Sequence, residues 1–126
     1  MTWITQLKAS HWLKWQKGRQ GTGYDKMLLA LNQKLIPFDC YLLRFPEGVS
    51  IPSHQDQVKS GKHYRLNIIL KKSKSGGEFI AEKSILNLSR IKLFRPDLYR
   101  HEVTPVQGGS RWVLSIGWIC ALKKEN

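Results

Sequence analysis

Three residues of this chain, His54, Asp56 and His101, have the types and the spacing of metal ligands. Side chains at positions i and i+2 of an extended strand leave on the same face, so His54 and Asp56 converge while Gln55 points away. A second imidazole from a facing strand would complete a set of two histidines and one carboxylate. Such a set typically holds non-haem Fe(II) and leaves coordination positions open, whereas a structural site is closed by the protein. The sequence therefore predicts a reactive iron centre.

A candidate anion-binding group follows the second histidine. If the strands that carry His101 and Arg111 form a hairpin through residues 106–109, the two residues lie on the order of 7 to 10 Å apart. A guanidinium at that distance suits the far carboxylate of a dicarboxylate that chelates the metal, and the Ser115 hydroxyl would lie on the same face. Two alternatives stay open: Arg111 forms a buried structural ion pair, and Ser115 is a small core residue with a satisfied hydroxyl.

The elements that position these residues are predicted to be short strands. From residue 38 onward the apolar residues alternate with a period of two between turn signals, which is typical of an all-β barrel or sandwich. The predicted strands cover residues 38–45, 64–70, 78–81, 84–86, 90–94, 99–104 and 110–119. In the last strand, one face carries Arg111 and Ser115 and the other carries Trp112, Leu114 and Trp118. We expect the bulky face to pack against protein and the Arg111 face to border a polar space.

The chain before Pro37 is predicted to be helical in part. Its apolar residues at positions 24, 27, 28, 31 and 35 follow the spacing of one helical face, and Pro37 ends the pattern. We expect one or two N-terminal helices within residues 1–36 to support a barrel formed by residues 38–119. A length of 126 residues predicts a single domain over residues 1–126.

Composition sets the expected environment and partners. Lysine and arginine number 21 against nine acidic residues, a net charge of +12, which suggests nucleic acid as a partner but also fits a basic soluble protein. Cys40 and Cys120 are few and far apart, as in proteins of reducing compartments. No leader-like segment or membrane-length apolar run is visible. We expect a cytoplasmic protein without membrane contact, in which the other histidines, His11 and His63, face solvent.

The order and spacing of these residues resemble the 2-oxoglutarate- and Fe(II)-dependent dioxygenases, most closely their prolyl-hydroxylase-like branch. The resemblance is carried by Phe45-Pro46-Glu47-Gly48, His54-Gln55-Asp56, Arg65 to Leu70, Gly76-Gly77-Glu78-Phe79, Leu93-Phe94-Arg95-Pro96, His101-Glu102-Val103 and Gly109 to Ile116. It implies a mainly β fold, the double-stranded β-helix, a cupin-like jelly-roll barrel. It also implies that His54, Asp56 and His101 hold Fe(II), that Arg111 binds the far carboxylate of 2-oxoglutarate, and that Ser115 lies near this cosubstrate. Candidates to complete the cosubstrate pocket are Tyr41, Tyr64 and, as a weaker choice, Asn67.

The activity implied by the resemblance is hydroxylation of a substrate C–H with O2 and 2-oxoglutarate, releasing succinate and CO2, with ascorbate as a candidate reductant. A protein or peptide side chain such as prolyl is the favoured target. The nucleic-acid demethylase branch resembles the chain around residues 37–39, yet it usually carries a second arginine where this chain has Gly117. Two alternatives therefore stay open: a dioxygenase that oxidises modified bases, and a basic nucleic-acid-binding module that has kept the fold without turnover.

Overall fold

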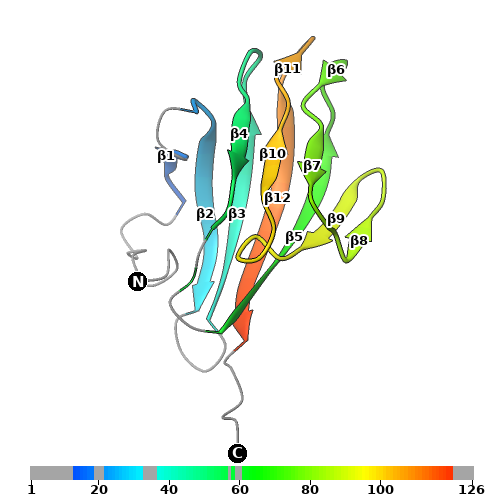
Figure 1. The fold of residues 1–126 in the computed structure, drawn as a ribbon. Coiled ribbons are helices and arrows are strands. Elements are labelled where there is room, and N and C mark those ends of the chain that lie inside the picture. Colours follow the sequence, from blue (N-terminus) through cyan, green and yellow to red (C-terminus); the bar gives the residue numbers. More distant parts are fainter. Residues whose placement is uncertain (1–12, 19–21, 33–36, 57, 59–60, 121–126) are drawn as a thin grey trace, which may run out of the picture.

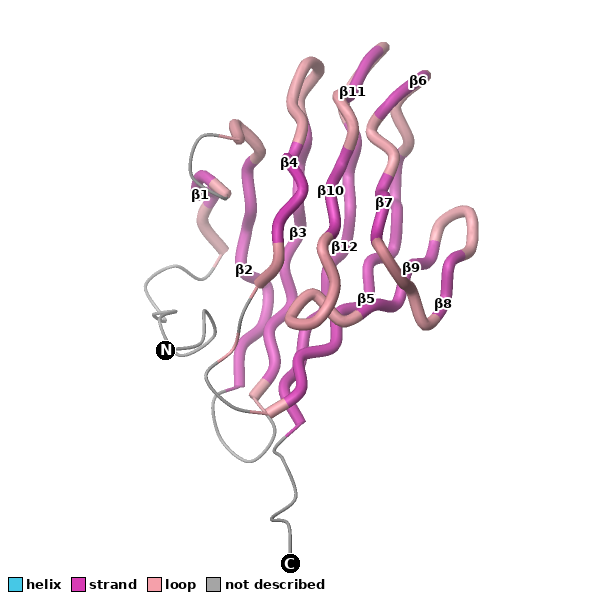
Figure 2. Tube along the Cα trace, in the orientation of Figure 1, coloured by secondary structure: helices cyan, strands magenta, loops and turns pink. Residues whose placement is uncertain are grey.

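The computed structural model describes residues 13–18, 22–32, 37–56, 58 and 61–120, and in that part of the chain it contains strands and no helix (Figure 2). The strands are β1 (Trp15–Lys17), β2 (Asp25–Asn32), β3 (Phe38–Phe45), β4 (Ile51–His54), β5 (Lys62–Lys71), β6 (Ser75–Gly76), β7 (Phe79–Ala81), β8 (Leu86–Asn87), β9 (Ile91–Phe94), β10 (His101–Val103), β11 (Val106–Gln107) and β12 (Arg111–Cys120). Among these residues there is accordingly no helix with the length and apolar character needed to cross a membrane.

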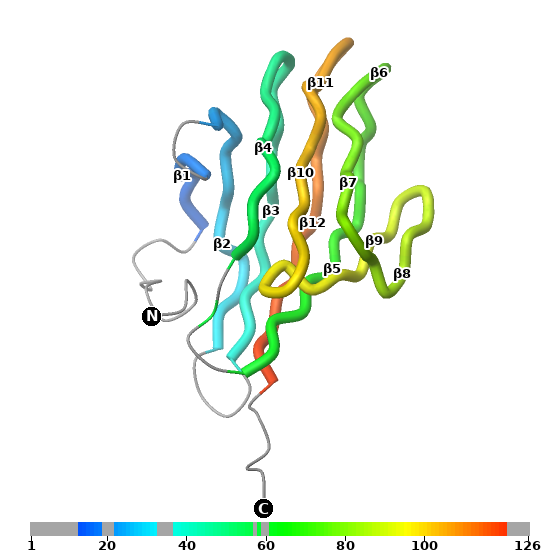
Figure 3. The backbone as a smooth tube through the Cα atoms, viewed as in Figure 1, coloured from blue at the N-terminus to red at the C-terminus, as the bar shows by residue number. Residues whose placement is uncertain are grey.

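Two sheets face each other. The larger has seven strands in the order β1-β2-β3-β12-β5-β9-β8, and the smaller has three in the order β4-β10-β7, with a β11-β6 pair as a third, short sheet. The smaller sheet lies in front of β3, β12 and β5 (Figure 1). The tube in Figure 3 places β4 beside β10, although about half of the barrel sequence separates them. All strand pairs are antiparallel, and the arrangement is the predicted double-stranded β-helix.

The predicted helix over residues 24–35 is wrong within the described residues, because Asp25–Asn32 forms strand β2. A β-bulge between Leu28 and Ala30 inserts one extra residue, so Leu28 pairs with Tyr41 and Leu31 with Asp39. Three residues of β2 thereby oppose two residues of β3, and positions i and i+3 lie on one face, as they would in a helix. The bulge accounts for the helix-like spacing of Leu28 and Leu31. The rest of the expected support segment, residues 1–12, 19–21 and 33–36, lies outside the described residues.

Strand β12 runs through the middle of the larger sheet, between β3 and β5. The face with Arg111, Val113 and Ser115 is buried, with exposed fractions of 3%, 0% and 1%. The opposite face, with Trp112 and Trp118, is only half-buried. The bulky face packs only in part, with Trp112 against Trp15 and Trp118 against Tyr64, whereas the polar space expected beside Arg111 is present as a cavity. It is the face with Arg111 and Ser115 that points inward, where a core cluster lies between the sheets: Phe45, Ile51, Ile69, Val103, Val106 and Val113.

The predicted hairpin between the strands of His101 and Arg111 is also wrong. Strand β10 pairs with β4 and β7 in the smaller sheet, while β12 pairs with β3 and β5 in the larger one. The chain crosses from one sheet to the other through β11, which pairs with β6. His101 and Arg111 therefore reach the interior from opposite sheets instead of lying side by side in one sheet.

Candidate metal centre

The three predicted metal ligands come together in the structure. His54 and His101 are direct cross-strand neighbours on β4 and β10, and their ring centroids lie 4.2 Å apart. Asp56 lies between them, with its Oδ1 3.6 Å from Nε2 of His54 and its Oδ2 3.4 Å from Nε2 of His101. One ligand atom from each residue lies within 4.8 Å of the others, which is close enough for one ion to bind all three.

Both imidazoles are held with Nε2 available to a metal. Nδ1 of His54 lies 2.8 Å from the carbonyl oxygen of Pro52, and Nδ1 of His101 lies 3.1 Å from that of Tyr99. A carbonyl oxygen only accepts hydrogen bonds, so each Nδ1 donates, and in the neutral ring Nε2 is then the atom that can bind a metal. Hydrogen bonds of this kind orient the histidines of metal sites.

Asp56 is positioned by a neighbouring loop instead of by a strand. Strand β4 ends at His54, whereas we had predicted an extended strand through Asp56. The backbone N–H of Asp56 donates to the carbonyl of Pro96 at 2.7 Å, and the Gln55 side chain turns away to donate to the carbonyl of Asp97 at 2.7 Å. The carboxylate reaches the two imidazoles because these bonds fasten the segment on both sides. Two imidazole nitrogens and one carboxylate oxygen fit Fe(II) with open positions.

Arg111 lines the same cavity as the triad, a space of about 420 Å³. Its guanidinium is 3% exposed and lies over the Phe45 ring, 5.1 Å from the centroid. No described acidic residue forms an ion pair with it, so the alternative of a buried structural ion pair is wrong for this part of the chain, and its Nη2 is buried without a hydrogen-bond partner. Burial lowers the pKa of Arg111 to about 10. A desolvated cation of this kind is stabilised by any anion that enters the cavity.

Ser115 and Asn67, both predicted to contact the cosubstrate, line the cavity but belong to a hydrogen-bonded network. Arg65 on β5 donates to Asp39 on β3 at 2.9 and 3.2 Å and to Oγ of Ser115 at 2.6 Å. The Ser115 hydroxyl in turn donates to Oδ1 of Asn67 at 2.6 Å. We call Asp39, Arg65, Asn67 and Ser115 the paired network. Burial raises the pKa of Asp39 to about 6, while Arg65 opposes that shift.

The paired network gives a physical reason for Gly117. This residue pairs with both Asp39 and Arg65 in the larger sheet. A Cβ at position 117 would lie 2.0 Å from Nη2 of Arg65, so a side chain there would displace the guanidinium from Asp39. Arg65 therefore occupies the space that a side chain at position 117 would take.

The other predicted residues divide between the interior and the outside. Tyr41 is 4% exposed and lines the cavity, where burial raises its pKa. Tyr64 points to the other face of the sheet and stacks on Trp118 with ring centroids 5.9 Å apart, so it does not line the cavity. His63 was expected to face solvent, but its side chain is buried, and burial lowers its pKa to about 3. His11 lies outside the described residues.

Two cationic residues of the cavity were missed from the sequence. Arg65 lies two positions before Asn67 on a predicted strand, so the period of two places both side chains on the same, inner face. Lys26 also lines the cavity, from strand β2. It was hidden by the wrong helix prediction.

The fold has solved counterparts of several kinds. No protein-family model matches the chain, and no curated protein sequence matches it. The cupin domain of Schizosaccharomyces pombe Cnp3 is similar with a TM-score of 0.62 and 9% identity, over 85% of this chain and 69% of that one. A Pseudomonas putida prolyl-4-hydroxylase has a TM-score of 0.61 and 16% identity, over 79% and 72%. The viral collagen prolyl hydroxylase of Paramecium bursaria Chlorella virus-1 has a TM-score of 0.54 and 21% identity, over 71% and 63%. At these identities the similarity establishes the fold alone.

Proposed function

We propose that this protein is an Fe(II)- and 2-oxoglutarate-dependent dioxygenase that hydroxylates a C–H of its substrate, with a protein side chain such as prolyl as the target. The observation that supports the proposal most strongly is the pairing of two features in one cavity. A set of two histidines and one carboxylate lies at one part of the wall, and the buried, unpaired guanidinium of Arg111 lies at another. A metal-binding acid with a second carboxylate satisfies both features at once.

The chain's own residues would divide the work between holding and orienting. His54, Asp56 and His101 would hold Fe(II), and Arg111 would orient 2-oxoglutarate through its far carboxylate. Bound iron and 2-oxoglutarate supply the oxidising chemistry with O2, releasing succinate and CO2. Tyr41 and Phe45 contribute ring surface to the wall of the cavity and limit the water that can enter it. The paired network links β3, β5 and β12 beneath them.

Oxidation of a nucleic-acid base is a second candidate, favoured by the net charge of +12. A second arginine on β12 would support it, but the space above Gly117 is taken by Arg65, whose guanidinium is bound to Asp39. In addition, Lys72, Lys74 and Lys92 gather around a different cavity from the one that contains the triad. The peptide target therefore stays the primary proposal.

The test is succinate formation by purified protein supplied with Fe(II), 2-oxoglutarate, O2 and ascorbate. The wild type should form succinate, and Asp56→Ala should lose Fe(II) binding and turnover together, because one ligand in three and the charge that neutralises the ion are removed. Asp25→Ala is the matched control, since Asp25 is an acidic residue of β2 that pairs with Lys17 and Arg44 outside the cavity. Full activity of Asp56→Ala would contradict the proposal.

The target class can be identified in the same reactions. Candidate peptides and oligonucleotides are incubated with the enzyme, and mass spectrometry searches for products that have gained the mass of one oxygen atom. Oxidised peptides would support the primary proposal, oxidised oligonucleotides the second candidate. Salt-dependent oligonucleotide binding without succinate would favour the binding module that has lost turnover.

A further inference from the structure

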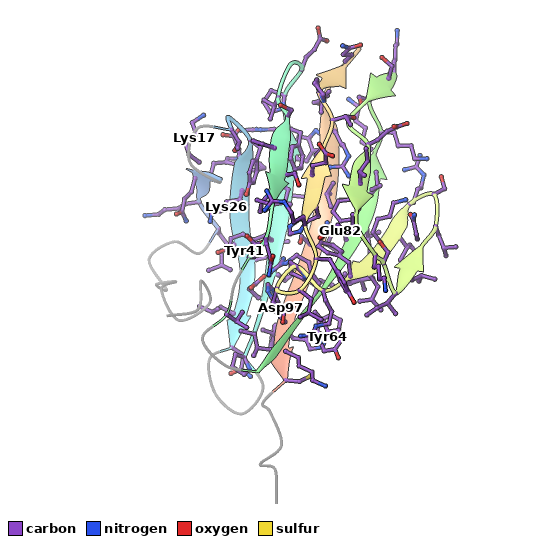
Figure 4. The ribbon with its side chains drawn as sticks, viewed as in Figure 1. Lys17, Lys26, Tyr41, Tyr64, Glu82 and Asp97 are labelled. Carbon is purple, nitrogen blue, oxygen red and sulfur yellow. The ribbon has the colours of Figure 1, made fainter. Side chains whose placement is uncertain are left out.

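Lys26 has a place in the cavity that the proposed chemistry does not use. It lies on β2, pairs with Leu43 of β3, and lines the same cavity as the metal triad. The smaller sheet faces β3, β12 and β5, whereas β2 extends past the edge of β4 (Figure 1). Figure 4 labels Lys26 and Tyr41 together on this side, next to β2 and β4. Lys26 is therefore on the side of the cavity that the smaller sheet leaves uncovered.

The Lys26 ammonium is half-buried without a carboxylate of its own. Its Nζ lies over the Tyr41 ring, 5.1 Å from the centroid. Among the described acidic residues none forms an ion pair with it, and the one that attracts it most, Asp39, already binds Arg65. Burial lowers the pKa of Lys26, since the ammonium has lost part of its hydration without gaining a partner anion.

Ion-pair contacts in the cavity leave Lys26 without a partner among the described residues. Arg65 is matched by Asp39. In the proposed complex Arg111 is matched by the far carboxylate of 2-oxoglutarate, and the two charges of Fe(II) by Asp56 and the near carboxylate. Glu102, the remaining acidic residue that lines the cavity, belongs to β10 in the smaller sheet and forms no ion pair with Lys26. Lys26 and Glu102 thus both lack an ion pair among the described residues, and Lys26 is the one on the side that the smaller sheet leaves uncovered.

We propose that Lys26 binds a carboxylate of the substrate, so that the preferred substrates are peptides with an aspartate or glutamate near the oxidised residue. This inference rests on the proposed function for the identity of the cavity. It names the substrate class, which the metal triad and Arg111 leave open.

A single ammonium fits a single carboxylate better than it fits a nucleic-acid strand. A phosphodiester chain carries a charge at every nucleotide and is bound by a groove of several cations. Apart from Lys26, the cationic residues that line this cavity are Arg65, which is paired with Asp39, and Arg111, which the proposed cosubstrate would occupy. The described lysines that do cluster, Lys72, Lys74 and Lys92, line the other cavity.

The test measures peptide selection without turnover. Protein is loaded with Mn(II) in place of Fe(II) and with N-oxalylglycine, an unreactive analogue of 2-oxoglutarate, and is then mixed with a pool of random octapeptides. Peptides retained by the protein are sequenced by mass spectrometry. The wild type should enrich aspartate and glutamate by about tenfold over the input pool, the effect of one charge-assisted hydrogen bond.

Four variants make the result specific to position 26. Lys26→Met should lose the acidic enrichment, Lys26→Glu should replace it with enrichment of lysine and arginine, and Lys26→Arg should keep it. Lys72→Glu is the matched control, because it makes the same change in net charge at an exposed lysine of the other cavity and should keep the acidic enrichment. Circular dichroism confirms that each variant is folded before its peptides are compared.

Three outcomes would overturn the inference: no acidic enrichment by the wild type, the same enrichment by Lys26→Met, or complete displacement of the retained peptides by a short oligonucleotide. The proposed function is tested by a separate measurement and is contradicted if no succinate forms in the turnover assay. Acidic selection that depends on Lys26 in a protein that forms no succinate would support the binding site and contradict the oxygenase.

Discussion

A partly buried guanidinium, that of Arg65, and a buried one, that of Arg111, border the same cavity and differ in their partners. Arg65 donates to both oxygens of Asp39 and to Ser115, so its charge and several of its N–H groups are satisfied by the protein. Arg111 is more deeply buried, yet among the described residues no carboxylate pairs with it, and its Nη2 has no hydrogen-bond partner. The two arginines lie on neighbouring strands of one sheet, β5 and β12.

The difference separates a structural charge from a binding charge. Taking an ion out of water costs several kcal/mol in real proteins, and a fold normally offsets this with a partner ion or hydrogen bonds. Asp39 offsets this desolvation cost for Arg65, whereas no described acidic residue offsets it for Arg111. A site that keeps an uncompensated cation stores binding energy for an anion, since the ligand then provides what the protein withholds. From this comparison we expect Arg65 to contribute to stability and Arg111 to bind a ligand, and each expectation can be tested.

The largest expected effect is at the paired network. Asp39→Ala leaves Arg65 buried without its counter-ion, and we expect the free energy of unfolding to fall by about 3 to 5 kcal/mol. Urea denaturation measures it. The control is Lys17→Ala, which breaks an exposed ion pair with Asp25 and should change stability by less than about 1 kcal/mol. The double variant Asp39→Leu/Arg65→Met should recover much of the loss, because no charge is then left buried. A small loss for Asp39→Ala would mean that Arg65 has other partners.

The opposite result is expected at Arg111. Arg111→Met removes a buried cation that lacks a protein partner, so the free energy of unfolding should stay level or rise, while the affinity for N-oxalylglycine should fall by on the order of 100-fold. Calorimetric titration of the Mn(II)-loaded protein measures the affinity, and urea denaturation the stability. Lys17→Met, at an exposed lysine that pairs with Asp25 and lines neither cavity, is the control and should leave the affinity unchanged. A large loss of stability with unchanged affinity would make Arg111 a structural residue and remove the contrast with Arg65.

The sequence predicted the barrel because strand patterns are local. A period of two and turn residues are visible within a few positions, and the predicted segments 38–45 and 110–119 match β3 and β12 closely. The error at β2 has the same origin, since a bulge is set by pairing with β3 and cannot be read from β2 alone. Local sequence likewise does not show to which sheet a strand belongs. The hairpin assumed between β10 and β12 is therefore absent, because the two strands lie in different sheets.

The candidate site was predictable to the extent that spacing determines it. His54 and Asp56 are two positions apart, and the structure places His101 directly across from His54. The paired network joins residues from three strands, with Asp39 and Arg65 separated by 26 positions. Nothing in either local sequence indicates that these two meet, so the sequence assigned Asn67 to the cosubstrate and left Ser115 open between the cosubstrate and a satisfied core position.

A further test of the interior near Arg65 uses pH, because the buried His63 lies on the same strand, β5. Burial, and then repulsion by Arg65, lowers the pKa of His63 to about 3 from an ordinary value of 6.5. As the pH falls below 6.5, the unfolded chain binds a proton at this residue and the folded chain does not, so stability is lost on acidification. We expect His63 to remove roughly 2 kcal/mol from the free energy of unfolding between pH 7 and pH 5.

His63→Gln isolates this contribution, because the variant should lose less stability than the wild type over the same interval. Asp39 acts in the other direction: its pKa is raised to about 6 from 3.8, so its contribution to stability is largest at low pH and is lost as the pH rises through about 6. The difference between wild type and His63→Gln cancels the Asp39 term. Equal pH slopes for the two proteins would mean that His63 titrates normally and that the interior near Arg65 is wetter than its burial indicates.

The smallest expected effect is at Ser115, and it tests whether this residue belongs to the paired network or to the cosubstrate site. Its hydroxyl accepts a hydrogen bond from Arg65 and donates one to Asn67, each at 2.6 Å, so both roles of the hydroxyl are already in use within the paired network. Ser115→Ala should lower the free energy of unfolding by about 1 to 2 kcal/mol, the effect of two buried partners that each lose a bond, and should leave the affinity for N-oxalylglycine unchanged. If the affinity instead fell about tenfold while stability held, the hydroxyl would turn toward the cosubstrate on binding, as the resemblance to the dioxygenases implies. Measuring the same variant by calorimetry and by urea denaturation separates the two, because a residue of the network changes stability and a residue of the binding site changes affinity.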